Sequence, residues 1–155
     1  MSIKDDLVRE IEEVTFIRNL IKELNELKSG MHYQVMLAKA MLDVPRDNVV
    51  RIINIKVDMS DIGLKEPISL FQFICISGDY HTTKYLFERG GNPVDKYMNK
   101  HLYLIVREIA ILNNDRDLGV LSIKIEAKRK LMIKFILGLY AVGLLFVGGL
   151  IYIVL

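Results

Sequence analysis

Residues 69–93 read SLFQFICISGDYHTTKYLFERGGNP, and the predicted fold depends mainly on this stretch. Its first part, 69–76, is an apolar run short enough for a buried helix, and Gly78-Asp79 then supplies a turn. A second helix is expected over 80–89. Glycine just past a helix end, with proline soon after, is the usual stop signal, and Gly90-Gly91-Asn92-Pro93 has that form. The stretch therefore predicts two short helices that form a hairpin.

Helix signals continue on both sides of this stretch. Apolar residues recur every three or four positions over 3–28, with charges between them, which predicts an amphipathic helix that caps the domain, or two short helices broken near Val14-Thr15. Further helices are expected at 32–43, ended by Pro45, and from Asp47, which can cap the helix, through Ile53. A last pair is expected at about 102–113 and 118–128.

An offset of 33 residues brings two of these helical pairs into register. It places 49–53 over 82–86 and Leu37 over Leu70. That period is typical of ankyrin arrays. Residues 69–93 resemble one ankyrin repeat: Gly78-Asp79 stands at the family's inter-helix turn, and 85–93 resembles the end of its second helix. The family's Thr-Pro-Leu-His opening is replaced by 69–72, and its paired alanines by Ile74-Cys75. A generic helical bundle stays open as an alternative.

The end of the sequence has a different composition. Phe135 to Leu155 are 21 consecutive uncharged residues, and a helix of that length reaches about 31 Å, close to the thickness of a hydrocarbon core. We therefore expect a transmembrane helix over 135–155, behind a basic collar at 128–134 that keeps the N-terminal domain cytoplasmic. The collar comprises Lys128, Arg129, Lys130 and Lys134, and the face expected to pack on another helix or on a second copy comprises Gly138, Ala141, Leu145 and Gly148.

The predicted fold class is therefore all-α. Stacked helical hairpins, either an ankyrin-like solenoid or a small bundle, precede one C-terminal transmembrane helix. The expected domains are a capping helix region at 1–30, the hairpin domain at 31–127, the collar and the membrane helix.

Charge argues against nucleic acid as a partner. Residues 1–127 hold 17 of the 21 basic residues and all 19 acidic ones, a net charge of −2. A nucleic-acid binder needs a basic stripe on its folded part. The single Cys75 lies in an apolar run and is expected to be a small buried residue.

Catalytic and metal-binding patterns are weak. Ser77, Asp79 and His81 fall within five residues, but members of a catalytic triad meet in space rather than in sequence, so a polar turn between two helices is the favoured interpretation. His32 and His101 lack a second ligand at a metal-binding spacing, and the glycines are too far apart for a phosphate cradle. We expect no enzymatic activity, no metal and no cofactor.

The leading functional hypothesis is a membrane-anchored interaction module that binds an unidentified cytoplasmic protein. The ankyrin resemblance implies binding through the loops between hairpins and the first-helix face. The residues it selects are Asp61, Lys65, Glu66, Gln72, Asp95, Lys96, Tyr97 and Asn99. The alternative is a membrane-active protein, such as a toxin, a lysis factor or a subunit of a membrane complex, that acts through its transmembrane helix. A third interpretation is a tethered enzyme that uses Asp79 or His81.

Overall fold

The computed structural model describes residues 3–27, 31–77 and 79–154, and the side chains of 7–27, 31–77 and 79–144. These residues form an all-α fold, as the sequence predicts, with two very small β-hairpins. The α-helices are α1 (Ile3–Leu27), α2 (Met31–Leu42), α3 (Val49–Asn54), α4 (Leu70–Ser77), α5 (Tyr80–Glu88), α6 (Leu102–Leu112) and α7 (Arg116–Val154). Two 3-10 turns, η1 (Arg46–Asn48) and η2 (Ser60–Ile62), and four strands, β1 (Lys56–Val57), β2 (Ile68–Ser69), β3 (Lys96–Tyr97) and β4 (Lys100–His101), complete the described elements.

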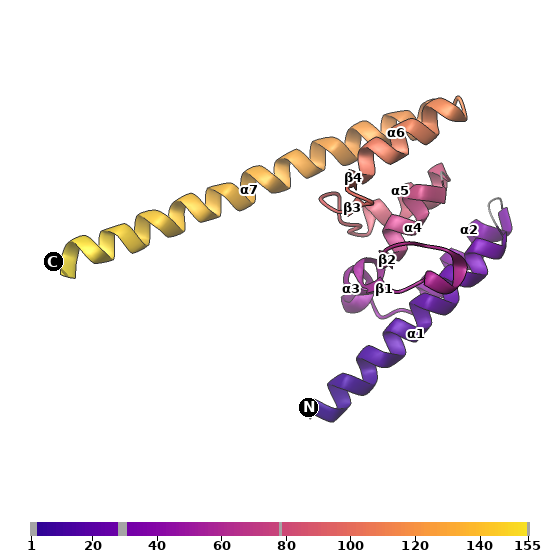
Figure 1. Cartoon of the computed structure of the whole chain (residues 1–155), viewed down its shortest axis with the longest axis horizontal. Helices are drawn as coiled ribbons and strands as arrows, with labels where there is room; N and C mark the ends of the chain where they lie inside the picture. Colours follow the sequence, from indigo (N-terminus) through magenta and orange to yellow (C-terminus); the bar gives the residue numbers. More distant parts are fainter. Residues whose placement is uncertain (1–2, 28–30, 78, 155) are drawn as a thin grey trace.

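Three helical hairpins stack on one another (Figure 1). Within the hairpins, α1 contacts α2, α4 contacts α5, and α6 contacts α7. Between them, α4 contacts both α1 and α6, while α5 contacts both α2 and α7. The first helices of the hairpins therefore form one layer and the second helices another.

Both connections between successive hairpins carry a two-stranded antiparallel sheet. The connection from α2 to α4 contains η1, α3, β1, η2 and β2, with Val57 opposite Ile68. The connection from α5 to α6 contains β3 and β4, with Lys96 opposite His101 and Tyr97 opposite Lys100.

Helix α4 is the centre of the core. It contacts α1, α3, α5 and α6, so water is excluded from nearly its whole surface, and Leu70, Phe71, Ile74 and Cys75 are all fully buried. This explains why its sequence is apolar without a polar stripe. The prediction for Cys75 is confirmed, and burial raises the pKa of its thiol.

The predicted stop after α5 is confirmed in atomic detail. Gly90 has a φ of +102°. Its N–H donates to the carbonyl of Phe87 at 3.3 Å, and the Gly91 N–H donates to that of Leu86 at 3.0 Å, the pair of bonds that defines a Schellman cap. Gly91 has a second reason to be glycine, because an added Cβ would lie 2.6 Å from the Phe71 ring.

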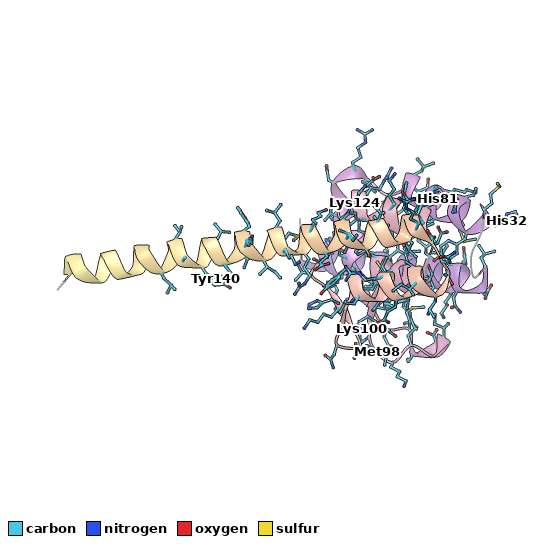
Figure 2. The ribbon with its side chains drawn as sticks, turned by 90° about the horizontal axis from the view of Figure 1, so that it is seen from above. His32, His81, Met98, Lys100, Lys124 and Tyr140 are labelled. Atoms are coloured by element: carbon cyan, nitrogen blue, oxygen red, sulfur yellow. The ribbon has the colours of Figure 1, made fainter. Side chains whose placement is uncertain are left out.

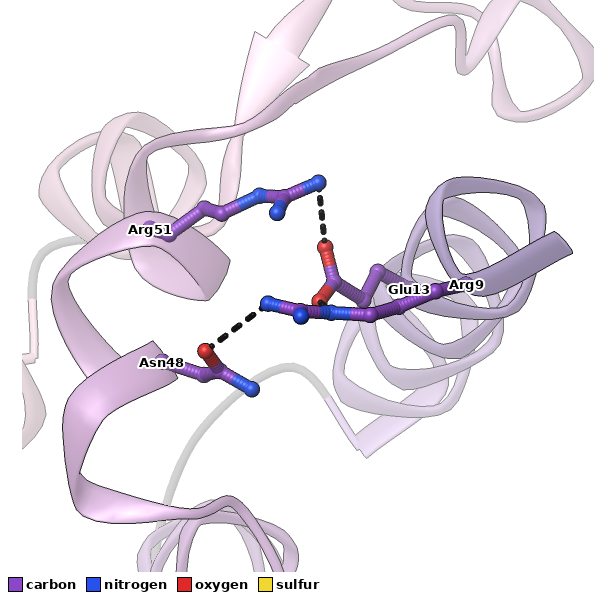
Figure 3. A network of polar contacts seen from close by, with 4 residues as sticks. All are labelled: Arg9, Glu13, Asn48 and Arg51. Carbon is purple, nitrogen blue, oxygen red and sulfur yellow. Dashed lines mark hydrogen bonds and ion pairs between the residues drawn. The ribbon is translucent and has the colours of Figure 1, made fainter. Parts of the chain in front are cut away.

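A nearly buried carboxylate joins α1 to the first connection (Figure 3). Glu13 of α1 accepts a hydrogen bond from Arg9 Nε at 3.1 Å, and Arg51 Nη2 of α3 lies 3.0 Å from its other oxygen as an ion pair. Arg9 Nη2 also donates to Asn48 Oδ1 at 3.1 Å. One carboxylate therefore pairs with two guanidinium groups and fixes α3 against α1.

Two details of the predicted helical pairs are wrong. Asp47 does not cap α3, because the residue at the N-cap is Asn48 and it makes no capping side-chain bond. The 33-residue offset aligns α3 with α5 and α2 with α4, but α2 packs against α1 and α5, while α3 packs against α4. The capping helix expected at 1–30 is therefore the first half of the first hairpin, and α3 is an addition to a connection.

The predicted transmembrane helix over 135–155 and the single-pass membrane location are contradicted. None of the helices, as far as the structure describes them, combines the length and apolarity needed to cross a bilayer. Helix α7 begins inside the domain, at Arg116, and packs its first turns on the other helices. In the expected packing face, Gly138 and Ala141 are exposed, while the side chains of Leu145 and Gly148 lie outside the described residues.

Candidate functional site

The two connections between hairpins lie against each other and form one surface, here called the loop surface (residues 55–69 and 89–101). The Glu66 carboxylate of the first connection accepts a hydrogen bond from the Met98 N–H of the second at 3.1 Å. At the end of α3, Asn54 donates to the carbonyl of Gly90 at 3.0 Å and accepts from the Asn92 N–H at 2.9 Å. These contacts hold segments that are more than 30 residues apart as one unit.

The first connection is also fixed to α1. Asp61 of η2 forms ion pairs with Lys22 and, at 3.6 Å, with Arg18. The hydrogen bond from Lys22 and the charges of both cations lower the pKa of the Asp61 carboxyl. Of the residues predicted to bind a partner from this connection, Lys65 and Glu66 are exposed, whereas the Asp61 carboxylate is already occupied by α1.

The second connection ends in an exposed two-residue tip. Met98 and Asn99 have φ values of 48° and 61°, and positive φ at both central residues is the hallmark of the tightest β-hairpin turns. Asn suits such a position, but Met does not, so the backbone at Met98 is strained. Met98 is nevertheless 49% exposed. The tip therefore presents an apolar side chain to solvent on a constrained backbone.

The residues that precede this tip are half-buried and support it. Asn92 donates to the Asp95 carboxylate at 2.9 Å, and Asn92 Oδ1 accepts from the Val94 N–H. Burial raises the pKa of Asp95, an effect that the positive charge of Lys56 partly offsets. Tyr97 packs against the edge of the core. Asp95 and Tyr97 therefore shape the hairpin, while Lys96 and Asn99 lie on its exposed side.

Gln72 is the predicted binding residue that the structure places furthest from solvent. Its side chain is fully buried. The amide oxygen accepts from the Ser69 N–H at 2.8 Å, and Nε2 donates to the Lys96 carbonyl at 2.7 Å. Gln72 therefore joins α4 to β3, and a partner cannot reach it.

Two of the four expected collar residues, Lys128 and Arg129, contact other elements of the domain, and a third, Lys130, pairs within α7. Lys128 Nζ lies 4.7 Å from the centre of the Phe87 ring. Lys130 pairs with Glu126 at 2.7 Å, and Arg129 Nη2 lies 3.1 Å from His101 Nε2. Lys134 is exposed. Lys128 and Arg129 therefore belong to the contacts by which α7 packs on the rest of the fold.

A cluster of charged and aromatic side chains around Tyr103 was not predicted from the sequence. The His101 ring stacks on the Tyr103 ring with centroids 5.8 Å apart. The guanidinium carbons of Arg107 and Arg129 lie 5.5 and 5.8 Å from the same ring centre, within the range of cation–π attraction. Burial, and then the charges of Arg129 and Lys96, lower the pKa of His101. The residues of the Tyr103 cluster come from α6, α7 and β4, so their spacing in the sequence gave no signal that they lie together.

The polar residues between α4 and α5 make turn contacts. Asp79 caps α5 by accepting from the N–H groups of His81 and Thr82 at 2.9 and 3.3 Å. Ser77 donates to the Ile74 carbonyl and accepts from the Tyr33 hydroxyl. His81 is exposed, and its ring lies edge-on to Tyr80. In the described part of the chain, no group of three or more metal-ligating side chains comes together.

Comparisons with known proteins add no assignment. No protein-family model matches the chain. No curated protein matches it. No solved structure matches it either. A function for this chain can therefore be inferred only from the geometry of its surfaces.

Proposed function

We propose that this chain is a non-catalytic interaction module of ankyrin type, whose loop surface binds another protein. Its proposed role is that of an adaptor or a regulatory subunit. The exposed residues available for contact are Lys65, Glu66, Lys96, Met98 and Asn99.

The observation that carries the proposal is the bond between Glu66 and the Met98 N–H. It connects the exposed ends of two neighbouring β-hairpins, and each hairpin is separately fixed to the helices behind it by Asp61 or Gln72. A surface that is ordered before binding loses less conformational entropy in a complex, and this favours recognition by loops on a rigid scaffold.

The order of elements supports the ankyrin part of the proposal. Helical hairpins alternate with β-hairpins along the chain. The second helical hairpin ends at α5, which is followed by the Gly90-Gly91 cap. The first connection departs from a regular array because it also contains η1 and α3. A partner would therefore contact a longer first connection than the loop of a regular ankyrin repeat.

The proposal is tested by site-specific crosslinking. Photo-reactive residues placed at Lys65 or Asn99 in the full-length chain should crosslink the same protein in cells. The matched control is Lys39, which is exposed on α2 and lies outside the loop surface. Crosslinks that are equal at all three positions, or absent from both loop positions, would refute the proposal.

A further inference from the structure

We propose that the face of the β3–β4 hairpin that carries Lys96 and His101, together with Arg129 of α7, binds carboxylates of an acidic peptide segment. This inference rests on the proposed function, because it names the chemistry of the partner of the loop surface. The face is called the Arg129 face below.

The register of the hairpin brings these groups together. Lys96 and His101 are directly opposite each other in β3 and β4, and side chains that oppose each other in an antiparallel pair point to the same face. Arg129 reaches the same imidazole from α7, with Nη2 3.1 Å from His101 Nε2. Three nitrogenous side chains from three elements thus converge.

Carboxylates near this face are already paired with other cations. Glu126 binds Arg107 and Lys130, each at 2.7 Å. Glu108 of α6 binds Lys100. Among the described side chains, no carboxylate forms an ion pair with Arg129 or Lys96. The face therefore carries positive charge that the described chain does not balance.

Two polar atoms at this face are buried without a partner among the described residues, Arg129 Nε and His101 Nδ1. A partly desolvated guanidinium is costly unless an anion pairs with it. Since His101 Nε2 faces an Arg129 donor, the imidazole is neutral there and carries its proton on Nδ1. The ring gives Arg129 an acceptor but no negative charge. A carboxylate accepts two parallel hydrogen bonds from a guanidinium and supplies that charge.

The surroundings favour an acidic peptide over a polyphosphate or nucleic acid. The Arg129 face is bordered by Glu66, Glu108 and Glu126, so the positive charge is local rather than a long stripe. A nucleic acid would follow a continuous stripe. Exposed Met98, two residues from Lys96, adds an apolar contact that a peptide side chain can use. Carboxylates separated by apolar residues match this pattern.

Fluorescence anisotropy tests the inference with the full-length chain and a short labelled peptide of alternating Glu and Leu. The same peptide with Gln in place of Glu reports binding without charge. We expect the Glu peptide to bind, and Arg129→Gln or Lys96→Gln to weaken it about tenfold or more. Lys124→Gln removes the same charge from the same helix, on the other side of α7 from Lys100 and Met98 (Figure 2), and should change affinity by less than about twofold.

Several results would overturn the inference. The first is that the Gln peptide binds as tightly as the Glu peptide. The second is that Arg129→Gln and Lys96→Gln both bind the Glu peptide as tightly as the unchanged protein. The third is that inorganic phosphate or an oligonucleotide competes as strongly as unlabelled Glu peptide. Lys96 is exposed, so its variant keeps the test valid if Arg129→Gln fails to fold. If crosslinks still form at Lys65 and Asn99 while the Glu peptide does not bind, the acidic partner is refuted and the proposed function stands.

Discussion

The carboxylate of Glu66 accepts a hydrogen bond from the backbone N–H of Met98, 32 residues further along the chain. This single contact connects the tips of two β-hairpins that belong to different inter-hairpin connections. It makes the loop surface one structural unit rather than two independent loops.

Glu66→Ala should therefore release the second tip. We expect faster amide hydrogen exchange at Met98, with a loss of unfolding free energy of about 1 kcal/mol or less because the bond is exposed. Amide exchange measured by NMR checks this. The control is Lys65→Ala, which removes a neighbouring exposed side chain without touching Met98. Equal exchange in both variants would show that the bond does not restrain the tip.

Gly91→Ala should destabilise the fold by about 1–3 kcal/mol, because the new methyl group would overlap the Phe71 ring. Urea denaturation gives the free energy of unfolding. Gly119→Ala is the matched control, because its Cβ would come no closer than 3.9 Å to a neighbouring side chain. Because Gly119 lies in the first turn of α7, this change should increase stability by about 0.5 kcal/mol. A stable Gly91→Ala protein would contradict the packing described here.

Asp79→Ala should cost about 1 kcal/mol of stability, since it removes the side chain that caps α5. His81→Ala should change stability by less than about 0.5 kcal/mol, because His81 is exposed. Thermal unfolding of the two variants separates these effects. A larger loss for His81→Ala than for Asp79→Ala would argue against the turn interpretation of both residues.

Stability should fall below about pH 6.5 in a way that depends on His101. The pKa of His101 in the fold is lower than its ordinary value of 6.5, through burial and the charges of Arg129 and Lys96. The unfolded chain therefore binds more protons in this range, so stability rises with pH. The contribution is complete above 6.5 and is lost as pH falls through the folded pKa. His101→Gln should flatten this part of the stability curve, and an unchanged slope would contradict the shift.

Local signals predicted much of the fold. The apolar run of α4 and the glycine stop after α5 depend on residues near in sequence, and both are confirmed. The helix expected over 3–28 is observed as α1. These features could be predicted because capping and burial of a short helix leave a pattern within one or two turns.

Long-range contacts could not be predicted in this way. The offset that aligned α3 with α5 failed because α1, not α3, completes the first hairpin with α2. Gln72 looks like a surface residue in sequence, but its amide finds partners on both sides, at Ser69 and Lys96, and is therefore buried. The Tyr103 cluster draws on residues from 101 to 129. Such contacts exist only once the hairpins have stacked.

Helix α7 is a single unbroken element of 39 residues, from its first turn at Arg116 to Val154. At 1.5 Å per residue it measures about 58 Å. Leu118, Leu121 and Ile125 are held in the core, whereas the described side chains from 134 to 144 are all exposed. The helix therefore has no break between its buried first turns and its exposed outer half. A force or a torsion applied to its outer half would act on the first three turns, and through Arg129 on the β3–β4 hairpin.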